Sequence, residues 1–113
     1  FMAYNNRGSL HFEKGELGPA LNDFNKAISL NTSYPLAYHN RGSVNFKMKK
    51  YAEALADFDQ AIKLDPNYAN AYLSRGIARE MNRDPEGACT DWRMAQELGL
   101  SQGKTYLINN CNQ

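Results

Sequence analysis

Side chains that commonly carry catalysis or bind metals are few in this sequence, and they are not grouped as such chemistry needs. The two histidines, His11 and His39, have neither a second histidine four residues away nor a nearby Cys-x-x-Cys pair, so no zinc site is indicated. Ser9 and Ser43 lack a base that would complete a catalytic triad. The sequence therefore predicts a protein that is not an enzyme and that has no metal and no cofactor.

The charged residues show a regular spacing instead. Three arginines are each followed sixteen residues later by an aspartate, and the pairs are Arg7 with Asp23, Arg41 with Asp57, and Arg75 with Asp91. Two antiparallel helices joined by a short turn can bring such positions together, so we expect a partly buried ion pair in each unit. Losing one partner of a buried pair leaves the other charge unpaired and costs several kcal/mol. The alternative is that these arginines contact a ligand.

Helices must position these pairs. Apolar residues recur at the helical spacing, for example Ala20, Phe24, Ala27 and Ile28 on one face. Turn residues interrupt this pattern at regular intervals, and Asp84 is expected to cap the helix that follows it. Six helices are predicted near residues 2–14, 18–31, 35–48, 52–65, 69–82 and 85–98.

The helices belong to a repeat of 34 residues. A shift of 34 aligns residues 3–9 with 37–43 and residues 20–30 with 54–64, and a second shift reaches the third unit. Small residues recur inside the helices as Gly8, Gly42 and Gly76, although glycine there costs about 1 kcal/mol relative to alanine. We expect them to permit a close helix approach, with small facing residues (Ala20, Ala54, Ala88) and large core residues (Phe24, Phe58, Trp92).

The pattern over residues 1–102 resembles the tetratricopeptide repeat, a helix–turn–helix unit with an aromatic, a glycine, and then small, aromatic and small residues. The Arg-Gly pairs and the closing stretch from Gly87 to Gly99 resemble bacterial members. The departures include His11, Asn45 and Arg79 in place of a tyrosine. The resemblance implies one all-α domain over residues 1–113, a right-handed α-solenoid with repeats 1–34, 35–68 and 69–102 and a capping helix 103–113, seven helices in total.

The resemblance also implies a concave groove lined by the first helix of each repeat, in which ligands lie. The matching positions here are Asn5, Asn6, Ser9, Phe12, His39, Asn40, Ser43, Phe46, Leu73, Ser74 and Ile77. We expect Asn6, Asn40 and Ser74 to stand in line and to bind a peptide backbone, because an asparagine amide both donates and accepts hydrogen bonds. The alternative is that these groups are only hydrated surface.

One specialisation of the family is not expected. Repeats that bind the acidic C-termini of chaperones hold the carboxylate with two lysines, an arginine and two asparagines. The matching positions here are Asn5, Ser9, Asn40, Asn70 and Ser74, so only Asn40 fits and every cationic residue is missing.

The C-terminal segment breaks the two-helix pattern and is expected to cover the apolar face of the last repeat. Ser101 is expected to cap its helix, which carries Tyr106, Leu107 and Ile108 and keeps Asn109, Asn110, Asn112 and Gln113 in water. Cys111 on this segment and Cys89 on the helix beneath it are expected to be close. The favoured interpretation is two packed thiols, and the alternative is a disulfide, which would imply an oxidising compartment.

Composition limits the remaining functions. Thirteen basic and twelve acidic residues give a net charge of +1, which does not favour a nucleic-acid partner, and no segment is apolar enough to insert into a membrane. The sequence predicts a scaffold that binds a protein or peptide in the groove. The alternative is a structural spacer or self-association module of a longer chain, with a possible homodimer through the uncapped N-terminal repeat. The sequence leaves the localisation open between the cytoplasm and, if a signal peptide has been lost, the periplasm or the outside of the cell.

Overall fold

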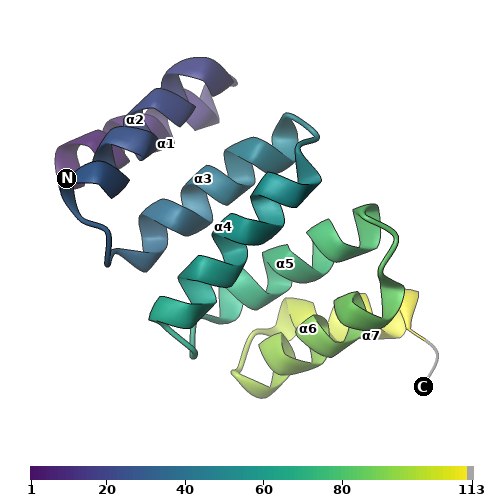
Figure 1. The fold of residues 1–113 in the computed structure, drawn as a ribbon. Helices are drawn as coiled ribbons and strands as arrows, with labels where there is room; N and C mark the ends of the chain where they lie inside the picture. Colours follow the sequence, from purple (N-terminus) through teal and green to yellow (C-terminus); the bar gives the residue numbers. More distant parts are fainter. Residues whose placement is uncertain (112–113) are drawn as a thin grey trace.

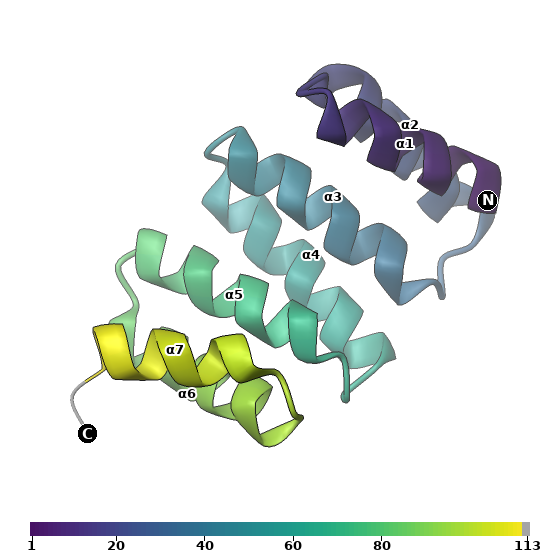
Figure 2. The same ribbon diagram turned by 180° about the vertical axis from the view of Figure 1, so that it is seen from behind.

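Helices account for almost all of the computed structural model, which describes residues 1–111. They are α1 (Met2–Glu13), α2 (Leu17–Leu30), α3 (Pro35–Lys47), α4 (Tyr51–Leu64), α5 (Ala69–Met81), α6 (Pro85–Glu97) and α7 (Ser101–Asn110). Consecutive helices pack in antiparallel pairs, and the pairs stack side by side from the N-terminal to the C-terminal end (Figures 1 and 2). Within the described residues the protein is therefore an all-α solenoid of three pairs and a seventh helix.

The ends of the first six helices agree with the sequence prediction to within one residue. Local signals explain this agreement. Pro35 and Pro85 lie in the first turns of α3 and α6, and the Asp84 carboxylate accepts a hydrogen bond of 3.0 Å from the Gly87 amide as an N-cap.

The start of the seventh helix differs from the prediction. It begins at Ser101 and not at residue 103, the N-cap is Leu100, and no side-chain capping bond is formed, so the expected cap by Ser101 is wrong. Leu100 is extended, with φ −91° and ψ 107°, and the helical backbone begins at the next residue, Ser101. The two last residues of the predicted capping helix, Asn112 and Gln113, lie outside the described part of the chain.

The three helix glycines allow the aromatic rings of the second helices to approach the first helices. A Cβ atom at Gly42 would lie 2.6 Å from Cε1 of Phe58, and one at Gly76 would lie 2.5 Å from Nε1 of Trp92. Gly8 has the same relation to Phe24 at 2.7 Å. The group nearest each glycine is thus the aromatic ring and not the alanine that the sequence analysis placed opposite it. The facing alanines are fully buried in the same core clusters as these rings.

Candidate ligand-binding groove

Polar side chains on the first helices pair with each other across the repeats. Asn40 on α3 donates a hydrogen bond of 3.1 Å from Nδ2 to Oδ1 of Asn5 on α1. One repeat further on, Nε2 of His39 lies 3.0 Å from Oγ of Ser74 on α5. Both contacts join positions 35 residues apart, so the side chains that meet are offset by one position from equivalent residues of the 34-residue repeat.

This offset changes the expected line of asparagines. The hydrogen bond of Asn40 goes to Asn5, which is only 2% exposed, whereas Asn6 is exposed. Leu73 is also buried and belongs to the core around Trp92, so neither Asn5 nor Leu73 presents a free side chain to a ligand. The sequence analysis missed this because it paired equivalent positions of the repeat.

The imidazole ring of His39 packs near two aromatic rings. Its ring centroid is 5.2 Å from that of Tyr68 and 5.5 Å from that of Phe58. Burial lowers the pKa of His39 below its usual value of 6.5. The neutral imidazole is therefore favoured in the folded protein, and it links α3 to α5 through Ser74.

A mainly apolar pocket of about 190 Å³ opens where the C-terminal halves of the first helices meet. Its lining consists of Phe12 from α1, Ser43, Phe46 and Lys47 from α3, Phe58 from α4, and Ser74 and Ile77 from α5. A second depression of about 290 Å³ adjoins it and shares two of these residues, Phe12 and Ser43. Its further lining includes Ser9, His39 and Asn40. Most of the predicted groove residues are thus brought together on one continuous surface, which we call the groove.

The Arg–Asp pairs join the first and the second helix of each repeat. Arg7 binds Asp23 through two hydrogen bonds of 2.8 and 2.7 Å, and Arg75 binds Asp91 in the same bidentate way at 2.9 and 2.8 Å. In the middle repeat, Nη2 of Arg41 lies 2.7 Å from Oδ1 of Asp57. Each of the three arginines is thus paired with the aspartate sixteen residues later, as expected from the spacing.

A third side chain in each repeat approaches the same carboxylate, and the sequence analysis noted these positions only as departures from a tyrosine. Asn45 donates to Asp57 at 3.0 Å, and Arg79 donates to Asp91 at 3.1 Å. The equivalent His11 has its Nε2 at 3.7 Å from Asp23. The signal that could have revealed them is a polar residue twelve positions before each aspartate.

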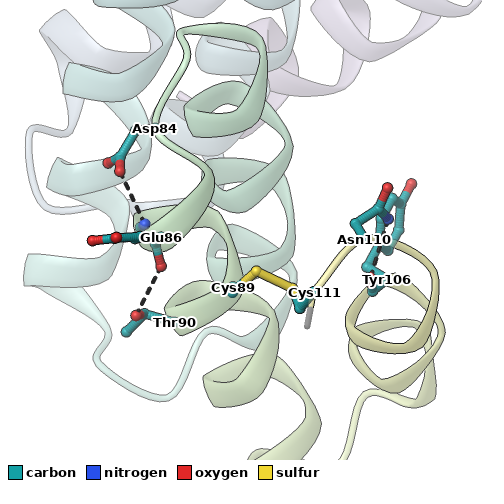
Figure 3. Close-up of a disulfide and its surroundings, with 8 residues drawn as sticks. Asp84, Glu86, Cys89, Thr90, Tyr106, Asn110 and Cys111 are labelled. Carbon is teal, nitrogen blue, oxygen red and sulfur yellow. Dashed lines mark hydrogen bonds between the residues drawn. A yellow bond between two sulfur atoms is a disulfide. The ribbon is translucent and has the colours of Figure 1, made fainter. Parts of the chain in front are cut away.

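Cys89 on α6 and Cys111 after α7 form a disulfide (Figure 3). Their Cα atoms are 6.0 Å apart, and the bond fastens the end of α7 to α6. The favoured interpretation of two packed thiols is therefore wrong, and the alternative is the one that the structure contains. The sequence could place the two residues near each other, but it could not give the geometry that decides between a contact and a bond.

No metal site or membrane span is found in the part of the chain that the structure describes. Among residues 1–111, no three His, Cys, Asp or Glu side chains are grouped so that they could hold a metal ion. None of the described helices has the length and hydropathy needed to cross a bilayer.

Comparison of the sequence with family models gives matches to one kind of repeat. Residues 35–68 and 58–90 match family models described as tetratricopeptide repeat, and residues 8–49 match one described as TPR repeat. No curated protein matches the sequence significantly.

Solved structures share this fold over most of the chain. The second TPR of Spaghetti (RPAP3) bound to the HSP90 peptide SRMEEVD is 30% identical, covers 86% of this chain and 90% of its own, and has a TM-score of 0.84. The second TPR domain of human RPAP3 in complex with the HSP70 peptide SGPTIEEVD is 29% identical, with coverages of 99% and 95% and a TM-score of 0.90. The Arabidopsis OM64 TPR domain is 25% identical, with coverages of 96% and 93% and a TM-score of 0.88.

Proposed function

Because the chain belongs to the tetratricopeptide-repeat family, we propose that it is a non-catalytic scaffold that binds a peptide or protein segment in the groove. The observation that carries this proposal is the apolar pocket between Phe12, Phe46 and Ile77. Apolar pockets with a few polar groups around them are typical binding sites, and here Ser43, Asn40 and Lys47 supply the polar groups.

We propose that the apolar pocket supplies most of the affinity, and not the polar side chains beside it. Asn5 and Asn40 bind each other, as do His39 and Ser74, so part of the hydrogen-bonding capacity of these side chains is already used. Burial of an apolar ligand side chain against Phe12 and Phe46 requires no such exchange of partners. We therefore propose a ligand that inserts one bulky apolar side chain.

The peptides bound by the two RPAP3 domains do not define the ligand of this chain. Both end in the acidic sequence EEVD. At the positions where chaperone-binding repeats are expected to hold the terminal carboxylate, this chain has no lysine or arginine. We propose that recognition here does not depend on a free C-terminus.

A selection from a random displayed peptide library tests the proposal, with the Ser43→Tyr variant designed to fill the pocket. Ser29→Tyr makes the same chemical change on an exposed part of α2 and serves as the matched control. Peptides selected on the unmodified protein should bind the control equally and should lose binding to Ser43→Tyr. Equal binding to both variants, or no enrichment of any peptide, would contradict the proposal that the groove binds a peptide. Circular dichroism checks that each variant is folded.

A second candidate function is self-association through the first repeat. Leu10 on α1 is 57% exposed, although the equivalent residues Val44 and Ala78 are fully buried. Static light scattering over a range of protein concentrations tests this candidate. A monomer throughout the range would exclude it.

We further propose that the protein functions in an oxidising compartment, because disulfides persist there and are rare in a reducing cytosol. The Cys89–Cys111 bond supports this proposal. Thiol alkylation of the protein in intact cells, before and after reduction, tests it. Alkylation of both cysteines without reduction would contradict it.

A further inference from the structure

The second depression of the groove, of about 290 Å³, differs in charge from the apolar pocket that it adjoins. Lys47 lines the apolar pocket but not this depression, whereas Glu13 lines this depression but not the apolar pocket. Burial lowers the pKa of His39, the other titratable residue of its lining, and so favours the neutral imidazole. Among the described residues that line the depression, Glu13 is therefore the only one with a full charge at neutral pH.

The polar side chains beside Glu13 already use hydrogen-bond donors inside the protein. Asn40 donates from Nδ2 to Asn5 at 3.1 Å, and the hydroxyl of Ser43 donates to the carbonyl oxygen of His39, also at 3.1 Å. What remains for a ligand is chiefly Oδ1 of Asn40, the lone pairs of Ser43 and the carboxylate of Glu13. These groups are acceptors, so the depression favours a ligand group that donates hydrogen bonds.

The charge of Glu13 is not explained by the stability of its own helix. Glu13 is the last residue of α1, it is exposed, and it forms no ion pair with another residue among 1–111. The C-terminal end of a helix carries a partial negative charge, so an acidic side chain there is slightly unfavourable. The equivalent residues of the other repeats are Lys47 and Met81. The carboxylate of Glu13 is thus a feature of the first repeat alone, and it is available to a cation.

We propose that this depression, the cation subsite, binds a lysine or arginine side chain of the peptide that the groove holds. The inference rests on the proposed function and adds a second recognised residue to the ligand, next to the bulky apolar one. The ammonium or guanidinium group binds Glu13 and the acceptor oxygens of Asn40 and Ser43. The apolar stem of the same side chain packs against the aromatic ring of Phe12, which also attracts a cation placed over its face.

The helices that form the two depressions determine the spacing of the two ligand residues. The cation subsite is formed mainly by α1 and α3 and the apolar pocket mainly by α3 and α5, and the two share Phe12 and Ser43. Packed helices lie about 8–10 Å apart, and an extended chain advances about 3.3 Å per residue. We therefore expect the basic residue of the ligand two or three residues from the apolar one.

Selection from the random displayed peptide library on a charge-reversed variant tests the proposal. Peptides selected on the unmodified protein should carry lysine or arginine two or three residues from a bulky apolar residue. Those selected on Glu13→Lys should carry aspartate or glutamate at that place instead. Glu53→Lys makes the same change of charge on an exposed part of α4 outside the groove, and it should select the same peptides as the unmodified protein. Circular dichroism checks that both variants are folded.

A selected peptide whose basic residue is replaced by norleucine measures the contact itself. Norleucine keeps the apolar stem of lysine and removes the charge. In fluorescence anisotropy titrations, the unmodified protein should bind the norleucine peptide about two- to fivefold more weakly than the original, the range for a solvent-exposed ion pair. The Glu13→Gln variant should bind the two peptides equally, because the charge that distinguishes them is gone.

Two results would overturn the inference. One is a set of selected peptides that have no basic residue at this spacing, or that are the same on Glu13→Lys as on the unmodified protein. The other is a norleucine peptide that loses the same affinity for the unmodified protein and for Glu13→Gln. If Ser43→Tyr still abolishes binding of these peptides, the groove proposal stands and only the cation subsite is wrong. If no peptide is enriched at all, both are wrong, so the two failures are distinguishable.

Discussion

Replacing the aspartate of each Arg–Asp pair by asparagine should destabilise the protein in a graded way. The substitution keeps the shape of the side chain but removes its charge and one acceptor. Asp91 is 1% exposed and holds Arg75 and Arg79, so Asp91→Asn leaves two cations with a weakened partner. We expect a loss of about 3–5 kcal/mol in the free energy of unfolding, the range for breaking one side of a buried pair.

The same substitution in the other two pairs should cost less free energy of unfolding. Arg41 is more exposed than Arg75, so water compensates for more of the loss and Asp57→Asn should cost about 2–3 kcal/mol. Asp23→Asn should cost the least, because the Arg7 side chain is mostly in water. Urea unfolding followed by circular dichroism measures all three, with Glu53→Gln as an exposed control. Equal losses at the three sites, or a loss largest at Asp23, would refute the reasoning that burial of the arginine decides the cost.

Three further predictions concern packing, the disulfide and pH. Gly76→Ala should lower the free energy of unfolding by about 1–3 kcal/mol in thermal denaturation, because its Cβ would lie 2.5 Å from the ring of Trp92, whereas Gly18→Ala, with no atom within 4 Å, should not. Reduction of the Cys89–Cys111 disulfide, which spans 22 residues, should cost about 3 kcal/mol in urea unfolding with and without a phosphine reductant, and an unchanged midpoint would contradict this. The lowered pKa of His39 means that the unfolded chain takes up a proton first as the pH falls below about 6.5, so stability should decrease between that pH and the pKa of the folded state, and His39→Gln should remove this component of the pH dependence.

The decrease in the free energy of unfolding at acidic pH should also depend on Asp23. The hydrogen bonds from Arg7 lower the pKa of this carboxyl below its usual value of 3.8. Its contribution is therefore complete above the pKa of the unfolded state and is lost as the pH falls through the lower pKa of the folded state.

The sequence was sufficient for the features that the repeat itself encodes. The helix ends follow from prolines and turn residues, and the Arg–Asp contacts follow from a sixteen-residue spacing that two short antiparallel helices bring together. Both depend on local geometry within one repeat, and this geometry is the same in all three.

Features between repeats were harder to predict. The contacts of Asn40 with Asn5 and of Ser74 with His39 depend on how far one first helix is shifted along the next, and equivalent sequence positions do not reveal that shift. The disulfide depends on the distance and direction of two Cβ atoms at the end of α7, where the repeat pattern has stopped. Side-chain positions there follow from tertiary packing and not from periodicity.

The disulfide at the C-terminal end of the stack affects the order in which the repeats unfold. In an array whose repeats contact only their neighbours, unfolding can proceed by loss of terminal units. Helices α6 and α7 are joined by the disulfide, and among residues 1–111 no other two helices are joined in this way. The α6–α7 end is thus expected to open last, so a protease that cuts transiently opened chain would leave the cross-linked helices as the last resistant fragment.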